Sequence, residues 1–168
     1  MSSVGSEARP EVWSWVRNGV LVGLIAGVSF LVFEMVVAGL LGASAFGPPR
    51  MMGATVLRGG ALTPQPALGL ALVLPIALVV HFILSAVYGA VFGAVAASFG
   101  ALRSSSGKLV VAASVFGLAL WLVNFYVIAP IAFPWFGMAN PVVQFLAHTF
   151  FFGSVLGLLL AKRSKTAG

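Results

Sequence analysis

The sequence predicts an all-α integral membrane protein, a bundle of four transmembrane helices with both termini on the cytoplasmic side. Three observations lead to this fold class: the composition, the number of long apolar runs and the placement of the basic residues. Of the 168 residues, 61% are hydrophobic and only 7% are charged, and the mean hydropathy is +1.12. Soluble domains are about half apolar and about a quarter charged, so this composition excludes a soluble enzyme and a disordered chain.

Four apolar runs are long enough to cross a bilayer, which takes about 20 residues in a helix. The expected spans are residues 18–42, 75–99, 109–132 and 141–161. The second run reaches back to residue 67, and Pro75 is the expected break within it, because proline interrupts helical hydrogen bonds. The spans account for nearly all of residues 1–168, so we expect a single polytopic membrane domain.

The segment between the first two spans, residues 43–66, is the predicted outer loop, because proline and glycine recur along it. Within this loop, residues 49–57 could form a short interfacial helix. Ala43-Ser44-Ala45 matches a signal-peptide cleavage pattern. The apolar run before it is too long for a signal peptide, so we expect a membrane span there.

The basic residues are divided unevenly between the two ends of the predicted bundle. With four spans, the N-terminus, the loop after the second span and the C-terminus share one side, and Arg50 and Arg58 lie on the other. The first side carries Arg9, Arg17, Arg103, Lys108, Lys162, Arg163 and Lys165. Because basic loops stay in the cytoplasm, this distribution predicts an N-in, C-in topology.

Small residues recur every four positions along the spans, which is typical of helices whose backbones pack closely in a membrane. We expect close helix contacts at Gly19, Gly23, Gly27, Ser85, Gly89, Gly93 and Gly117. A weak internal repeat matches Gly27 to Gly117 and Gly89 to Gly153, although chance matches are common in a chain rich in glycine. Such a repeat would make the two helix pairs parallel units, as in some transporters.

Each span carries one strongly polar side chain. These are Glu34, His81, Asn124 and His148, with Gln144 one turn before His148. At about 1.5 Å per residue, their depths coincide within about a turn, in the outer half of the bilayer. Ionisable groups are costly in hydrocarbon, so this polar layer is the candidate site. We expect Glu34 within hydrogen-bond or one-water reach of a histidine.

Four interpretations of the polar layer are open. It could be structural, with a protonated Glu34 bonded to His81, or it could carry protons or ions. Glu34, His81 and His148 could hold a divalent metal, and the two histidines could hold haem b, although we expect no cofactor. Arg50 either extends to the lipid headgroups or pairs with Glu34.

No catalytic constellation is present, because the chain lacks cysteine and aspartate and contains no metalloprotease, serine-hydrolase or phosphate-loop motif. The expected partner is the lipid bilayer, with a homo-oligomer or a larger membrane complex as a further option. Nucleic acid is excluded because the basic residues do not cluster. The sequence therefore predicts a non-enzymatic accessory or structural membrane protein. The alternatives are a small proton or ion channel or carrier, and a haem- or metal-binding membrane protein.

The order of motifs over residues 17–163 is similar to that of a known family. The chain contains GLIAGVSFLVFEM with a PPR loop, then VHFILSAVYGAVFG, FGLALWLVNFYVIAPIAFPWF and VVQFLAHTFFFGSVLG with a basic tail. The more specific elements are His81-x-x-x-Ser85, the turn from Pro130 to Trp135, and His148 followed by aromatic residues. In these elements the chain resembles the YagU-like four-span proteins, a family of unknown function. The resemblance implies a helical bundle in the bacterial inner membrane and no established chemistry, and Glu34 fits a divergent branch.

Overall fold

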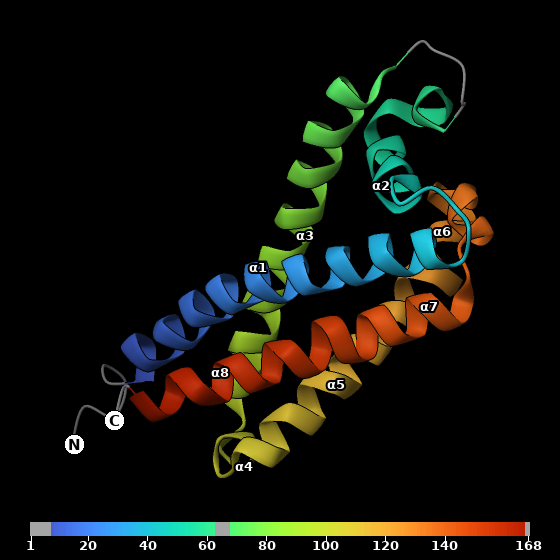
Figure 1. Cartoon of the computed structure of the whole chain (residues 1–168). Helices are drawn as coiled ribbons and strands as arrows, with labels where there is room; N and C mark the ends of the chain where they lie inside the picture. Colours follow the sequence, from blue (N-terminus) through green and yellow to red (C-terminus); the bar gives the residue numbers. More distant parts are fainter. Residues whose placement is uncertain (1–7, 63–67, 167–168) are drawn as a thin grey trace, which may run out of the picture.

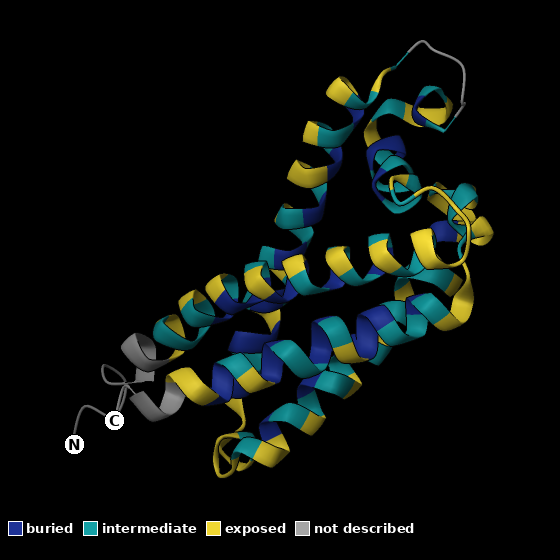
Figure 2. Ribbon diagram, in the orientation of Figure 1, coloured by how far each residue is buried: buried dark blue, intermediate teal, exposed yellow. Residues whose placement is uncertain are grey.

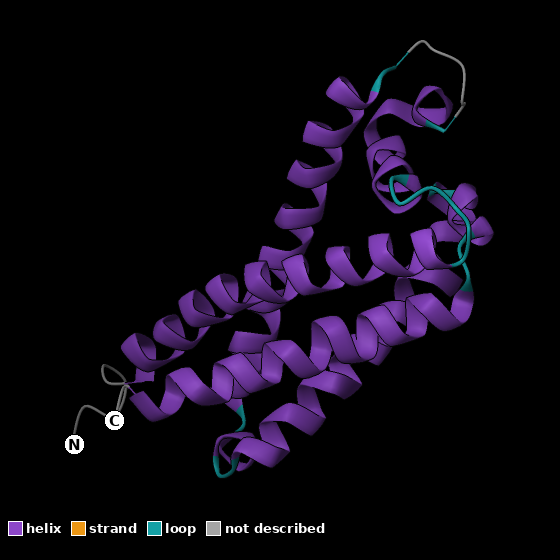
Figure 3. Cartoon of the chain, viewed as in Figure 1, coloured by secondary structure: helices purple, strands orange, loops and turns teal. Residues whose placement is uncertain are grey.

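The computed structural model describes residues 8–62 and 68–166, and these residues form helices joined by short loops, without a strand (Figure 3). Four helical segments of this part are long and apolar enough to cross a membrane: Val12–Leu40, Leu70–Ser98, Ser106–Ala132 and Pro141–Arg163. The all-helical class and the four long apolar helices are therefore confirmed.

The first two long segments are single helices, and the last two are assembled from several helical elements; Figure 1 shows the α-helices in chain order. The α-helices are α1 (Ala8–Leu40), α2 (Gly47–Leu57), α3 (Leu70–Ser98), α4 (Gly100–Arg103), α5 (Ser106–Val123), α6 (Ala129–Ala132), α7 (Pro141–Leu146) and α8 (Val155–Thr166). Two π-helical segments, η2 (Asn124–Ile128) and η4 (Ala147–Ser154), join α5 to α6 and α7 to α8. Two short 3-10 helices, η1 (Arg58–Ala61) and η3 (Pro134–Met138), lie in the loops.

Local sequence explains where the main helices begin and end. Gly42 adopts a left-handed φ of 76°, and the hydrogen bonds from Ala43 N to Ala38 O and from Gly42 N to Gly39 O close α1 in the pattern typical of a glycine C-terminus. The Ser105 side chain accepts from the Lys108 amide at the start of α5. The Asn140 side chain caps α7 in the same way, with Pro141 in the first turn.

The expected break at Pro75 is wrong, because α3 runs without interruption from Leu70 to Ser98. Pro75 lies in the second turn of the helix. Its missing amide removes one hydrogen bond, to the carbonyl of Ala71, and all later turns retain their own amides. The helix begins at Leu70, after Gly69, whose extended backbone marks the N-cap position.

Glycines bring α1 and α3 into direct backbone contact where the two helices cross. An added Cβ at Gly19 would meet the backbone of Gly89 and Gly93, and one at Gly23 would meet Ser85 O at 2.5 Å. A Cβ at Gly27 would collide with the Ser85 side chain. Close approach of this kind allows van der Waals contact along the two backbones, which is the main attraction between helices in lipid.

The second crossing joins α5 to η4 and α8 and is built in the same way. A Cβ at Gly117 would meet the backbone of His148 and Gly153. Beside this contact, the hydroxyls of Ser114 and Ser154 hydrogen-bond to each other at 2.7 Å. The small residues singled out in the sequence thus lie where the helices meet.

The two crossings repeat each other in their contacts. In the first crossing Gly89 lies against Gly19, Gly93 against Trp15, and Gly23 against Gly89. The corresponding contacts of the second crossing are Gly153 against Ala113, Gly157 against Leu109, and Gly117 against Gly153. The expected match of Gly27 to Gly117 is therefore wrong by one turn, and Gly23 is the equivalent residue. The π-helical segment η4 explains a further offset: Ser85 precedes Gly89 by four residues, whereas His148 precedes Gly153 by five.

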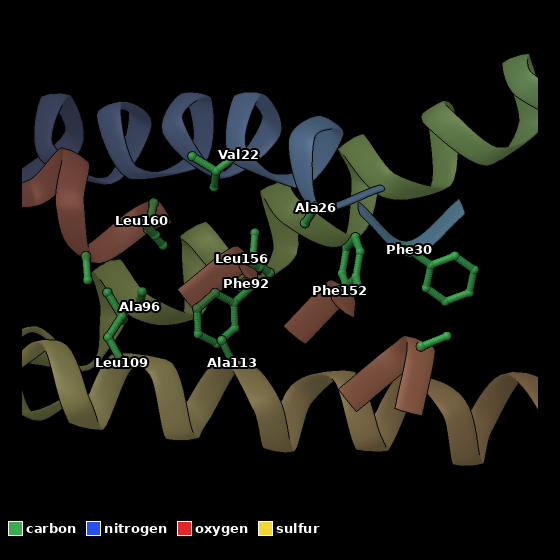
Figure 4. Packing of buried hydrophobic residues seen from close by; sticks show 12 residues of the cluster. Val22, Ala26, Phe30, Phe92, Ala96, Leu109, Ala113, Phe152, Leu156 and Leu160 are labelled. Carbon is green, nitrogen blue, oxygen red and sulfur yellow. The ribbon is translucent and has the colours of Figure 1, made fainter. Parts of the chain in front are cut away.

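The apolar core fills the half of the bundle that lies toward the two termini. Figure 4 shows Val22 of α1, Phe92 of α3 and Leu109 of α5 converging there, with Leu156 and Leu160 of α8 between them. In Figure 2 the buried residues follow the inner faces of the long helices, and the exposed ones follow the outer faces. At the opposite end α3 diverges from α1, and α2 packs between them (Figure 1).

The crossing contacts predict how a single methyl group changes stability. Gly89→Ala places a Cβ against the backbone of Gly19 and Gly23, so the helices must separate, and we expect the free energy of unfolding to fall by about 1–3 kcal/mol. Gly39→Ala is the matched control, because nothing lies within 4 Å of its added Cβ. It should leave stability unchanged or raise it by up to about 1 kcal/mol through helix propensity. Unfolding in detergent measures both, and equal stability of the two variants would contradict the crossing.

Candidate functional site

A cavity of about 460 Å³ lies in the half of the bundle away from the termini. Its volume is in the range of small-molecule sites, about 300–1,000 Å³. The walls come from the second half of α1, the loop and α2 that follow it, the middle of α3, η2, α6, η3, α7 and the start of η4. The residues that line it are Phe30, Glu34, Val37, Ala38, Leu41, Ala43, Ser44, Gly47, Pro48, Met51, Met52, Thr55, Leu84, Tyr88, Asn124, Phe125, Ile128, Ala129, Phe133, Phe136, Met138, Ala139, Asn140, Val143, Gln144 and His148.

Glu34 is the one acidic side chain among these residues, and it is only 7% exposed. Its Oε1 accepts a hydrogen bond from Gln144 Nε2, so α1 is tied to α7 across the bundle. The expected bond from Glu34 to His81 is wrong, because the amide of Gln144 takes that place. Gln144 also links the carboxyl group to a histidine indirectly, since its backbone oxygen accepts from His148 Nδ1 at 2.9 Å.

Arg50 does not pair with Glu34. Its guanidinium donates to the carbonyl of Ala61 at 3.2 Å, and so connects α2 to the end of η1. Carbonyls at a helix end lack partners within the helix, which makes Ala61 a favourable acceptor for a cation. Within the residues that the structure describes, Glu34 has no ion-pair partner.

His81 lies outside the cavity, at the crossing of α1 and α3. Its Nε2 lies 2.9 Å from Gly27 O, and because a carbonyl only accepts, Nε2 carries the proton. Ser85, one turn later, donates to His81 O at 2.8 Å. Gly27 lies two turns before Glu34 on α1, so these contacts separate His81 from the cavity and assign it to helix packing.

His148 lines the cavity from η4 and is held by aromatic rings. Its Nδ1 must carry the proton in the bond to Gln144 O, which leaves Nε2 with a free lone pair when the ring is neutral. Phe30 and Phe125 meet the imidazole edge to face, with centroids 4.7 and 5.5 Å from it. Phe30 also belongs to the apolar core, so this ring closes the cavity on the side of the termini.

Asn124 reaches the cavity from the start of η2. Its Oδ1 accepts from the hydroxyl of Tyr88 at 3.2 Å, which ties η2 to α3. Four of the five residues of the predicted polar layer therefore line one cavity, namely Glu34, Asn124, Gln144 and His148. Sequence reasoning missed the role of Tyr88 at the cavity. It also missed both π-helical segments, because neither residue type nor spacing distinguishes a π turn from a regular one.

The arrangement does not fit the metal and haem interpretations. In the described ranges 8–62 and 68–166, no group of three histidine or acidic residues comes together, so Glu34, His81 and His148 do not form a metal site. A haem between the two histidines would need the space beside both imidazoles. Phe30 takes that space, with centroids 5.5 Å from His81 and 4.7 Å from His148.

Comparison with protein-family models, curated proteins and solved structures finds no match to this chain. The chemistry of the site is therefore read from its residues alone. A largely apolar cavity with one carboxyl group, three side-chain amides, an imidazole, a phenol and the hydroxyls of Ser44 and Thr55 can bind a molecule that is largely apolar and carries one polar group.

Proposed function

We propose that this chain is a non-enzymatic, multi-pass protein of the inner, cytoplasmic membrane that binds a small amphipathic molecule in its cavity. The observation that carries the proposal is Glu34, a buried carboxyl group that faces a largely apolar cavity and has no ion-pair partner among the described residues. A lone ionisable group is expensive in hydrocarbon and is retained where it has a task. Kinship with the YagU-like proteins and assembly into an oligomer or a larger complex remain proposals beside it.

The outer surface of the four long helices supports the membrane location. It exposes large apolar side chains, among them Val32, Val36, Val79, Ile83, Val87, Val111, Val115, Val127, Phe150 and Leu158. A soluble protein rarely leaves so extensive an apolar surface uncovered, whereas lipid tails solvate it without cost.

The blind end of the cavity favours a binding site over an open channel. Toward the termini, the core around Val22, Phe92 and Leu156 is fully buried, and the crossings bring backbones into contact. The described residues of that half therefore offer ions no open polar route in this conformation. A carrier that exchanges protons at Glu34 is the second candidate, because one carboxyl group can take up and release a single proton.

The basic residues support an orientation with both termini in the cytoplasm. Arg17, Arg103, Lys108 and Arg163 belong to the ends of the long helices on the side of the termini, and α2 with Arg50 lies at the other end (Figure 1).

Reporter fusions test this topology. Fusions after Ser106 and after Gly168 should both report a cytoplasmic position, and an insertion at Gly59 should report the outer side, because the basic residues hold the first two in the cytoplasm. A periplasmic signal from either of the first two fusions would contradict the proposed orientation.

Ligand binding is tested with a neutral probe, radiolabelled 4-phenylbutan-1-ol, by equilibrium dialysis of the protein in detergent against empty micelles. We expect saturable binding of about one probe per chain. Ala38→Trp should abolish it, because Ala38 lines the cavity one turn after Glu34. Val36→Trp is the matched control, since Val36 is 53% exposed on the outer face of the same helix. Binding that never saturates, or that survives in Ala38→Trp, would contradict the proposal.

A further inference from the structure

We propose that the ligand is a lipophilic cation, a molecule with an apolar or aromatic body and one ammonium-type charge, which pairs with Glu34 and displaces its proton. This inference rests on the proposed function and specifies the ligand class of the same cavity.

The charges around the cavity select a cation over an anion. Among the residues that the structure describes, Glu34 is the only acid that lines it, and no lysine or arginine does. Arg50, the basic residue of α2, donates to Ala61 O. An anion would meet no positive partner there, whereas a cation would provide the ion pair that Glu34 lacks.

Other titratable groups that face Glu34 do not supply this charge. His148 on η4 lies between the rings of Phe30 and Phe125 and bonds to Gln144 O, not to Glu34. Tyr88 on α3 donates to Asn124, and Gln144 is neutral. His81 on α3 bonds to Gly27 O and lies outside the cavity. The carboxyl group of Glu34 is therefore stable in this apolar setting either as the protonated acid or as a carboxylate paired with a bound cation.

The walls fit the body of such a molecule. Phe30, Phe125, Phe133, Phe136 and Tyr88 line the cavity from α1, η2, the loop with η3, and α3. Aromatic faces attract cations electrostatically and also accept apolar groups. A hydrated inorganic ion would gain little from this aromatic part of the walls, because aromatic rings offer no oxygen ligands to replace its water.

Cation binding and proton release are then one exchange. In the empty site Glu34 is a neutral acid that accepts from Gln144 through one oxygen. On binding, the O–H bond of the carboxyl group breaks, the proton leaves to solvent, and the carboxylate pairs with the incoming positive charge. The net charge of the site is unchanged, and the Gln144 bond is kept in both states.

The test compares phenylbutyl-trimethylammonium with its uncharged carbon isostere, both by equilibrium dialysis with the purified full chain. In the parent protein the cation should bind at least tenfold more tightly than the isostere, and about one proton should be released per bound cation in weakly buffered solution. Glu34→Gln should weaken cation binding at least tenfold more than it weakens isostere binding, and it should abolish proton release. Glu11→Gln, which removes an acid before the first predicted span, should behave as the parent.

The outcomes separate the two proposals. Equal affinity for cation and isostere in the parent, or cation binding without proton release, would overturn this inference while the cavity itself stood. Binding of neither compound, together with no binding of 4-phenylbutan-1-ol, would overturn the proposed function. The parent measurements decide the matter even if Glu34→Gln does not fold.

Discussion

Backbone contact at two glycine-lined crossings is the constraint on which the rest of the structure depends. In lipid, apolar side chains gain nothing by leaving one hydrocarbon surface for another, so helices associate through close packing and hydrogen bonds. Gly23 against Gly89, and Gly117 against Gly153, allow that packing in two helix pairs that repeat each other. All four residues lie in the half of their helices toward the termini, so the tight half of the bundle is defined by these contacts.

The space in the half of the bundle away from the termini follows from the close helix contacts in the other half. Helices that touch at one end and diverge toward the other leave space, which α2, the connecting segments and a cavity of about 460 Å³ occupy. The hydrogen bonds from Gln144 to Glu34 and from Tyr88 to Asn124 join the helices around the cavity. These polar groups therefore join the helices and also line the cavity. The structural interpretation of the polar layer and its interpretation as a binding site are compatible.

Much of this was visible in the sequence, and the missing parts have physical reasons. A spacing of four identifies small residues on one helix face, so the glycines at the crossings could be found without coordinates. Depth counting placed Glu34, Asn124 and His148 in one layer, because helical rise is nearly constant. It could not show that His81 turns to Gly27 O or that Arg50 turns to Ala61 O, since rotation about the helix axis depends on the partner helix. The one-turn error in the internal repeat has the same origin, because only contact between the pairs sets their register.

The central claim is that Glu34 stands in the empty cavity as a neutral acid without a cation, and infrared spectroscopy tests it directly. The chain has three acidic side chains, all glutamate, and the other two, Glu7 and Glu11, precede the first predicted span. The account predicts one protonated side-chain carboxyl band at neutral pH, which moves on labelling glutamate with carbon-13 and disappears in Glu34→Gln. A spectrum without that band, identical in parent and variant, would mean that Glu34 is ionised and paired, and would contradict the account.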